Sequence, residues 1–248
     1  MRESTLEESQ ELDENDLVKE LSEKDIIIFS KDLVKNYEIG NWIVKAVDNV
    51  SLSVKNGEFL AIKGPSGAGK TTLLNLIGGL DSPNSGVIYN QGVKISDMDQ
   101  ESLTLFRLIN SGFIFQNYNL ISTLTAEENV MFPMNLAGIK FEDQRNRASA
   151  LLKEINLGDR REHLPFQLSA GEQQRIAIAR ALANDPPVLL ADEPTANLDK
   201  RTSQFLRDLF KDLKEKEKTI IVVTHDDDLI GIANRVISFD DGKIIEEN

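Results

Sequence analysis

Residues 64–71 are the part of the chain most clearly suited to chemistry. Their letters, GPSGAGKT, match G-x-x-x-x-G-K-[ST], the pattern of a loop that binds phosphate through backbone N–H groups. The glycines let these N–H groups converge on one anion, and the helix that follows adds positive potential at its N-terminus. The residues predicted to hold nucleotide phosphates are Gly64, Pro65, Ser66, Gly67, Ala68, Gly69, Lys70 and Thr71. Among them Lys70 would reach the β- and γ-phosphates, and the Thr71 hydroxyl would bind Mg²⁺.

The flanks of this loop decide between phosphate binding and an ordinary glycine-rich turn. Residues 58–63 form a short, largely apolar run suited to a buried strand, and residues 72–77 continue as a helix. A strand, a glycine loop and a helix N-terminus therefore follow one another in the order that a phosphate-binding loop needs. This order favours the phosphate-binding interpretation.

Asp192 and Glu193 follow the four apolar residues 188–191, which predict a central parallel strand buried on both faces. Because the carboxyl ends of parallel strands meet at one edge of a sheet, Asp192 is predicted to complete the Mg²⁺ site. Alternation along the strand would point Glu193 toward a water that attacks the γ-phosphate, so Glu193 is the predicted general base. The alternative for this Asp-Glu-Pro triplet is a strand-ending turn, which the upstream phosphate loop disfavours.

Gln116 and His225 stand at the ends of two further predicted strands, residues 113–115 and 219–224. Gln116 would orient the water or bind Mg²⁺, and His225 would contact the γ-phosphate. A lone Gln or His is usually structural, and only the positions of these two at strand ends favour a catalytic role. Ser169 and Glu172 have the spacing of a helix capping box, and such a helix start is also an anion-binding surface.

The segments between these residues predict an α/β fold. An antiparallel sheet is expected from strands at 26–29 and 43–54, separated by a loop that contains Tyr37. Helical patterns run from 125 to about 156 with a break at Pro133, then over 173–184 and 202–216. Together they predict a P-loop NTPase core of the RecA-like type, an antiparallel β subdomain and a helical subdomain at about 117–170.

Composition narrows the class of protein. The 248 residues carry 28 basic and 41 acidic side chains, a net charge of −13, which argues against a surface for nucleic acid. Residues 1–25 hold ten acidic and three basic residues and predict an acidic tail, disordered or loosely helical. No cysteine is present, and no apolar run approaches the roughly 18 residues that a membrane span needs. The cytoplasm is the expected location, and a membrane role would need a partner.

Taken together, these motifs resemble the nucleotide-binding subunits of ABC transporters over residues 26–245. The chain contains, in the family order, the Walker A loop, a Q-loop at Gln116, a signature at 168–172, a Walker B strand ending at Asp192, a D-loop with Asp199 and a switch His225. The resemblance implies an ATPase domain over 26–248 that uses ATP and Mg²⁺. It also implies that Tyr37 stacks on adenine, with Trp42 a weaker rival, and that Thr72 contacts the nucleotide.

Residues 74–81 and 112–121 resemble the lipoprotein-release and macrolide-export branch of this family. The resemblance implies a transmembrane permease partner that works mechanically, a peripheral position on the cytoplasmic face of the membrane, and a homodimer or pseudo-homodimer of ATPase subunits. In such a dimer the signature residues Ser169, Ala170, Gly171 and Glu172 act in trans. Residues 119–134 are rich in apolar side chains and are expected to contact the permease.

Two signature residues depart from the usual pattern of the family, which carries Gly and Gln at these positions. Ala170 adds a Cβ where the backbone would approach a phosphate, and Glu172 brings a negative charge unless the capping box engages its carboxylate. Ser169 and Gly171 are retained, so the chain is expected to be active.

Two other functions compete with a transporter ATPase. A soluble ABC ATPase of DNA repair or translation, not coupled to transport, would typically carry a long coiled-coil insertion or two cassettes in one chain, and neither is present. A nucleotide-switched binding module with little hydrolysis would not need Glu193 and His225. Both alternatives are therefore less favoured.

Overall fold

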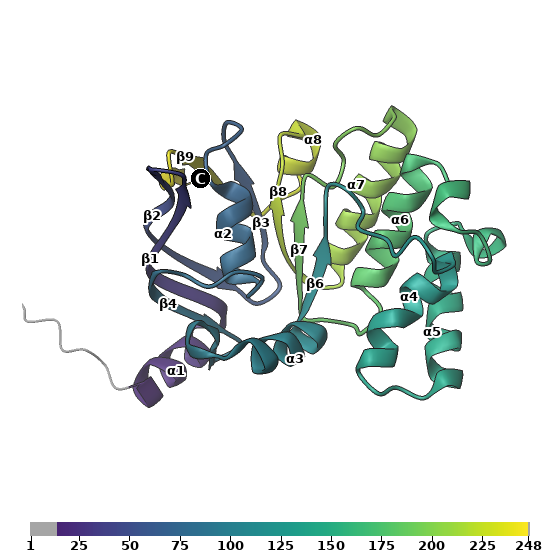
Figure 1. The fold of residues 1–248 in the computed structure, drawn as a ribbon, viewed down its shortest axis with the longest axis horizontal. Helices are drawn as coiled ribbons and strands as arrows, with labels where there is room; N and C mark the ends of the chain where they lie inside the picture. Colours follow the sequence, from purple (N-terminus) through teal and green to yellow (C-terminus); the bar gives the residue numbers. More distant parts are fainter. Residues whose placement is uncertain (1–13, 248) are drawn as a thin grey trace, which may run out of the picture.

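The core of the protein is a six-stranded sheet in the order β10-β9-β3-β8-β7-β6, seen in a computed structural model that describes residues 14–247 (Figure 1). Its strands are parallel except for β10, which forms an antiparallel hairpin with β9. The strands are β3 (Phe59–Lys63), β6 (Ser111–Ile114), β7 (Val188–Asp192), β8 (Thr219–Val223), β9 (Arg235–Asp240) and β10 (Lys243–Glu247).

Both faces of this sheet are covered, which explains the continuous apolar runs of its strands. Along β3, Leu60 and Ile62 pack into one hydrophobic cluster with α2 (Lys70–Ile77), while Phe59 and Ala61 pack into a second cluster. The second cluster contains residues of α6 (Ala170–Ala181) and α7 (Lys200–Glu215). The predicted α/β fold is confirmed.

Strand order places the predicted site residues at one edge of the sheet. Strands β3, β8 and β7 are neighbours, so the P-loop after β3, His225 after β8 and Asp192 at the end of β7 leave the sheet side by side. Strand β6 lies next to β7, and Gln116 follows it by two residues. The carboxyl edge of a parallel sheet is where α/β proteins bind ligands.

A four-stranded sheet in the order β2-β1-β4-β5 forms the predicted antiparallel subdomain. Its strands are β1 (Ile26–Ile39), β2 (Trp42–Lys55), β4 (Ser85–Asn90) and β5 (Val93–Lys94). The prediction that Tyr37 lies in a loop is wrong, because β1 continues past it and pairs Tyr37 with Val44. Only two residues, Gly40 and Asn41, connect β1 to β2.

Part of the predicted acidic tail is ordered as helix α1 (Glu14–Glu23), which contacts β1. Leu21 is buried, and the Tyr89 hydroxyl on β4 donates to the Glu14 carboxylate at 3.3 Å. Within residues 14–25 the tail is therefore a packed helix, because one apolar side chain of its amphipathic pattern reaches the sheet. The rest of the predicted tail, residues 1–13, lies outside the described residues.

The segment predicted to be a helical subdomain contains α4 (Ala126–Leu136) and α5 (Phe141–Glu154), which both pack against α6. The predicted break at Pro133 is wrong, because α4 runs through the proline. A proline removes one backbone hydrogen bond, and burial of Val130, Met131 and Met134 keeps the helix intact. Helix α3 (Gln100–Asn110), which precedes β6, was not predicted from the sequence. No helix within residues 14–247 is long and apolar enough to cross a membrane.

Candidate functional site

The loop between β3 and α2 has the strained backbone that its glycines predict. Gly69 is the N-cap of α2 in the left-handed conformation, with φ 100°, and a Cβ there would lie 1.9 Å from the Ala46 carbonyl oxygen. Lys70 begins the helix, and its buried ammonium donates to the carbonyls of Gly64 at 2.6 Å and Pro65 at 2.7 Å. Burial lowers the pKa of Lys70, against the charges of nearby Glu193 and Asp192.

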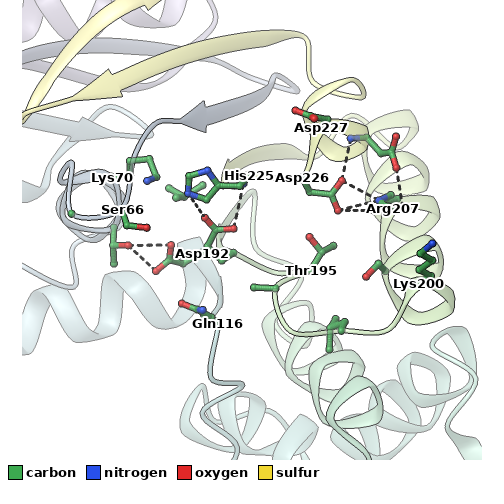
Figure 2. A pocket seen from close by; sticks show the side chains of 18 residues that line it. Ser66, Lys70, Gln116, Asp192, Thr195, Lys200, Arg207, His225, Asp226 and Asp227 are labelled. Carbon is green, nitrogen blue, oxygen red and sulfur yellow. Dashed lines mark hydrogen bonds and ion pairs between the residues drawn. The ribbon is translucent and has the colours of Figure 1, made fainter.

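Thr71 and Asp192 meet although 121 residues separate them. The Thr71 hydroxyl donates to the Asp192 carboxylate, with oxygen–oxygen distances of 3.0 and 3.1 Å (Figure 2). Burial raises the pKa of Asp192, and the Thr71 hydrogen bond and the Lys70 charge oppose that rise. Gln116 lines the same cleft, so the three predicted metal ligands lie together.

The direction of the Glu193 side chain is set by a turn, whereas the sequence prediction that it points toward an attacking water was based on strand alternation. Strand β7 ends at Asp192, and Glu193 has a left-handed backbone with φ 46°, a conformation rarely adopted by a residue with a side chain. Its carboxylate lies 3.3 Å from His225 Nε2 and accepts the His225 backbone N–H at 3.3 Å. Burial raises the pKa of Glu193, and His225 and Lys70 act to lower it. A raised pKa suits a general base.

These side chains line one open cleft of about 900 Å³ at the carboxyl edge of the sheet (Figure 2). Its lining includes Ser66, Gly67, Lys70, Thr71, Gln116, Asp192, Glu193 and His225. The predicted residues Tyr37, Ser169, Ala170, Gly171, Glu172 and Asp199 do not line it. The structure thus brings part of the P-loop together with the Walker B, Q-loop and switch residues and leaves the signature residues and Asp199 outside, whereas the D-loop residues Ala196 and Leu198 line the cleft.

Tyr37 lies on the antiparallel subdomain and is about one-third exposed. Its hydroxyl donates to the Asp81 carboxylate at 2.7 Å, and the Lys35 ammonium lies 5.2 Å from its ring centre and 2.6 Å from the same Asp81. Burial and the bond to Asp81 raise the pKa of Tyr37, and a hydrogen bond with Thr72 opposes this. Tyr37 and Thr72 are therefore adjacent, which is compatible with one nucleotide touching both.

Ser169 caps α6, and the predicted capping box with Glu172 is confirmed. The predicted helix start at residue 173 is wrong, because the cap allows α6 to begin at Ala170. Gly171 is buried, and a Cβ there would lie 2.7 Å from the Thr202 side chain on α7. The glycine is therefore also required for packing between two helices of its own chain.

Asp199 caps the next helix, α7. Its carboxylate accepts the backbone N–H groups of Arg201 at 2.9 Å and Thr202 at 3.1 Å, and the Thr202 hydroxyl at 2.7 Å. The helix consequently begins at Lys200, two residues before the predicted start. Within the chain Asp199 fixes the turn after Walker B and makes no contact with the cleft.

The far wall of the cleft was not predicted from the sequence. Arg207 on α7 donates to both carboxylate oxygens of Asp226, at 2.8, 3.1 and 3.2 Å, and lies 3.0 Å from Asp228 (Figure 2). Asp226 directly follows His225 and caps α8 (Asp227–Ile230). A sequence signal existed only for this cap, since Asp before a short helical run is a common N-cap, and no spacing rule links it to Arg207.

The arrangement has the components of phosphoryl transfer to water. A strained glycine loop and a buried ammonium bind anionic phosphates, hydroxyl and carboxylate oxygens suit a hard divalent cation, and a carboxylate of raised pKa can accept a proton. Among residues 14–247 no group of three or more His, Cys, Asp or Glu side chains is placed to hold a metal alone.

Comparison with known proteins agrees with this geometry. A family model described as ABC transporter matches residues 47–196. The chain is 46% identical over 220 residues to an uncharacterized ABC transporter ATP-binding protein, MJ1508, of Methanocaldococcus jannaschii, covering 89% of this chain and 98% of that protein. It is also 46% identical over 222 residues to the macrolide export ATP-binding/permease protein MacB of Hyphomonas neptunium, but spans only 34% of that protein.

A solved structure supports the same relationship at the level of the fold. The dimeric, post-hydrolysis state of the ATP-binding cassette MJ0796, bound to ADP and Pi, superimposes with a TM-score of 0.85 at 44% identity. The match covers 89% of this chain and 97% of the cassette. Because the family model spans more than half of the chain and MJ1508 is matched over 98% of its own length, the chain belongs to the ABC transporter family.

Proposed function

We propose that this chain hydrolyses ATP in the cleft at the carboxyl edge of the sheet and uses it to drive a membrane permease. The observation that carries the proposal is the convergence of Lys70, the Thr71–Asp192 pair and the Glu193–His225 pair in one cleft. Tyr37 would stack on adenine, with Thr72 beside it, and the P-loop would hold the phosphates.

Each residue of the cleft has a defined role in this proposal. The Lys70 ammonium and the P-loop N–H groups bind the β- and γ-phosphates, and Gln116 orients the attacking water. The water oxygen bonds to the γ-phosphorus as the bond to the β–γ bridging oxygen breaks, and Glu193 accepts the proton that the water loses. His225 holds Glu193 through its ring and backbone, and contacts the γ-phosphate.

The cleft fits Mg²⁺ bound together with ATP. Thr71 and Asp192 present oxygen atoms within hydrogen-bonding distance of each other, and the Gln116 amide lines the same space. Oxygen donors are the ligands that this cation prefers. When bound, Mg²⁺ would neutralise charge on the β- and γ-phosphate oxygens.

Two copies of the chain would form two composite sites in a head-to-tail dimer. Ser169 and Gly171 do not line the cleft of their own chain, and in this proposal they complete the cleft of a second copy. The MJ0796 cassette, 44% identical, has been solved as a dimer. The partner subunit could be a second copy or a closely similar chain.

A groove along β6 is the proposed permease contact. It is largely apolar, has a volume of about 560 Å³ and runs between α3, β6 and α4. Leu105, Phe132 and Leu136 line it and are exposed, whereas Val130 and Met131, which had also been expected at this contact, are buried in the core. MacB relatives are named ATP-binding/permease proteins, which supports a permease partner and a place on the cytoplasmic face of the membrane.

The variant Glu193→Gln tests the catalytic part of this proposal. It removes the base while keeping size and hydrogen bonding, so turnover should fall by ~10²–10⁴-fold, while ATP still binds and stabilises a dimer. Steady-state ATPase assays and analytical ultracentrifugation with and without ATP would measure both. Hydrolysis at the wild-type rate would show that Glu193 is not the base.

A further inference from the structure

Ser169, the serine of the signature, is hydrogen-bonded to the carboxylate of Glu172. Glu172 Oε2 accepts the Ser169 backbone N–H at 2.8 Å and the Ser169 hydroxyl at 2.9 Å. The Ser169 oxygen in turn accepts the Glu172 N–H at 3.3 Å. The one hydroxyl proton of Ser169 is therefore directed at a carboxylate of its own chain.

That carboxylate carries its charge at neutral pH. The backbone N–H of Ser169 lowers the pKa of Glu172, and the Ser169 hydroxyl and the charges of Arg160 and Arg175 lower it further against the effect of burial. An uncompensated negative charge beside Ser169 repels an incoming phosphate. Closure of a second copy onto Ser169 therefore requires a positive group nearby.

Arg160 is the basic side chain placed to compensate the negative charge of Glu172. Its Nε lies 3.5 Å from Glu172 Oε1, the oxygen that the capping box leaves unused. Its guanidinium also lies 3.3 Å from His163 Nε2, which helps to hold it in place. Arg175, the other nearby cation, is engaged elsewhere, donating to the carbonyls of Gly171 and Ile155 and stacking over Phe205.

We infer that Arg160 is a positioning residue for ATP-driven closure, which compensates the Glu172 charge so that Ser169 can turn its hydroxyl to the γ-phosphate held by a second copy. The inference rests on the proposed function, in which Ser169 acts in trans. The role of Arg160 is tied to the acidic residue at position 172. With a neutral glutamine there, the amide oxygen can still cap the helix and no charge needs compensation.

The test is a double-mutant cycle in the full chain carrying Glu193→Gln, with ATP-dependent dimerisation followed by analytical ultracentrifugation. Arg160→Ala should raise the ATP concentration for half-maximal dimerisation about threefold to fivefold, the range of a half-exposed ion pair. Arg160→Lys should restore most of the loss, and higher salt should diminish the effect because it screens the charges. In chains that retain Glu193, Arg160→Ala should raise KM for ATP with little change in kcat.

The decisive comparison uses Glu172, the partner of Arg160 in the ion pair. When Glu172→Gln is already present, adding Arg160→Ala should cause no further change. Arg161→Ala is the matched control, since Arg161 pairs with Glu127 at 3.9 Å and Glu162 at 3.6 Å. An equal loss from Arg160→Ala in both backgrounds, or an equal loss from Arg161→Ala, would overturn the inference.

The same experiment separates the inference from the function on which it rests. If the Glu193→Gln chain dimerises with ATP and Arg160→Ala changes nothing, the inference alone is wrong. If the Glu193→Gln chain forms no ATP-stabilised dimer, the proposed composite site fails and the inference falls with it.

Discussion

Among single residues, Glu193 and His225 form the pair whose electrostatics bear most directly on turnover. Burial raises the pKa of Glu193, and the His225 imidazole works against that rise. A general base acts only when deprotonated, so activity is present above its pKa and lost as the pH falls through it. The raised pKa places this loss at higher pH than for an exposed glutamate.

We therefore predict that His225→Ala moves the acid limb of the kcat/KM profile to higher pH, in addition to lowering kcat. The substitution removes the ring that lowers the pKa of Glu193 but keeps the backbone N–H bond. A pH–rate profile of both proteins, with circular dichroism to check that each stays folded, would measure the shift. An acid limb that stays in place or moves to lower pH would contradict this account of the pair.

At the scale of elements, the Arg207–Asp226 pair fastens the turn after His225 to α7. Both side chains are largely buried, and Asp226 also accepts the backbone N–H groups of Asp228 and Leu229 at 3.1 Å. Burial alone would raise the pKa of Asp226, but the Arg207 hydrogen bonds and the backbone bond from Leu229 more than offset this and lower it. His225 is thus followed directly by a residue that is anchored to α7.

Arg207→Ala should lower the free energy of unfolding by about 1–3 kcal/mol at neutral pH, because it leaves Asp226 without its charged donor. Lys211→Ala, an exposed position on the same helix, should have little effect. Because the folded pKa of Asp226 is lowered, its contribution is present above its unfolded pKa and disappears as the pH falls through the folded value. The difference between variant and wild type, measured by urea denaturation, should therefore shrink in acid, and a constant or growing difference would refute the assignment.

A second prediction at this scale concerns the groove between α3 and α4, the proposed permease contact. Leu105→Glu places a charge in the proposed permease contact and should reduce the fraction of full-length chain that sediments with membranes of its native cells. Leu105 is 58% exposed, so the fold should tolerate the change. Phe141→Glu, at an exposed apolar residue outside the groove, is the matched control. Equal loss from both variants would mean that the groove is not the contact.

For the whole molecule, each chain has one P-loop cleft and one signature helix start that lies outside it. If two copies complete each other's sites, each site takes Lys70 from one chain and Ser169 from the other. Activity should then rise more steeply than linearly with protein concentration near the dimer dissociation constant. The two halves of a site should also be separable by mutation.

We predict that mixing Lys70→Ala with Ser169→Arg chains restores ATP-dependent dimerisation and some hydrolysis. Each homodimer has two half-damaged sites, whereas a mixed dimer has one doubly damaged site and one intact site. Dimerisation and ATPase activity of the mixture would be compared with each variant alone, after chain exchange is shown with labelled copies. A mixture that forms no more dimer than its components would rule out composite sites.

The sequence by itself determined the features that depend on neighbouring residues. The P-loop, the capping box of Ser169 and Glu172, and the doubly buried strands β7 and β8 all follow from local spacing and hydrophobic pattern, so the α/β class was predictable. Strand ends also indicated which residues would lie near one another. Helix α3 was not predicted, and the break predicted at Pro133 does not occur. In both cases burial of one face of the helix stabilises it, and local pattern does not report that burial.

Only the tertiary structure decided contacts between residues far apart in the chain. The Arg207–Asp226 pair, the Tyr37–Asp81 bond and the approach of Arg160 to Glu172 join separate elements whose distances no local pattern encodes. The left-handed turn at Glu193 also arises there, held by the Val223 carbonyl on β8, which accepts its N–H at 2.8 Å, and by His225. Local patterns fix elements and their caps, whereas sheet order and side-chain packing fix which charges meet.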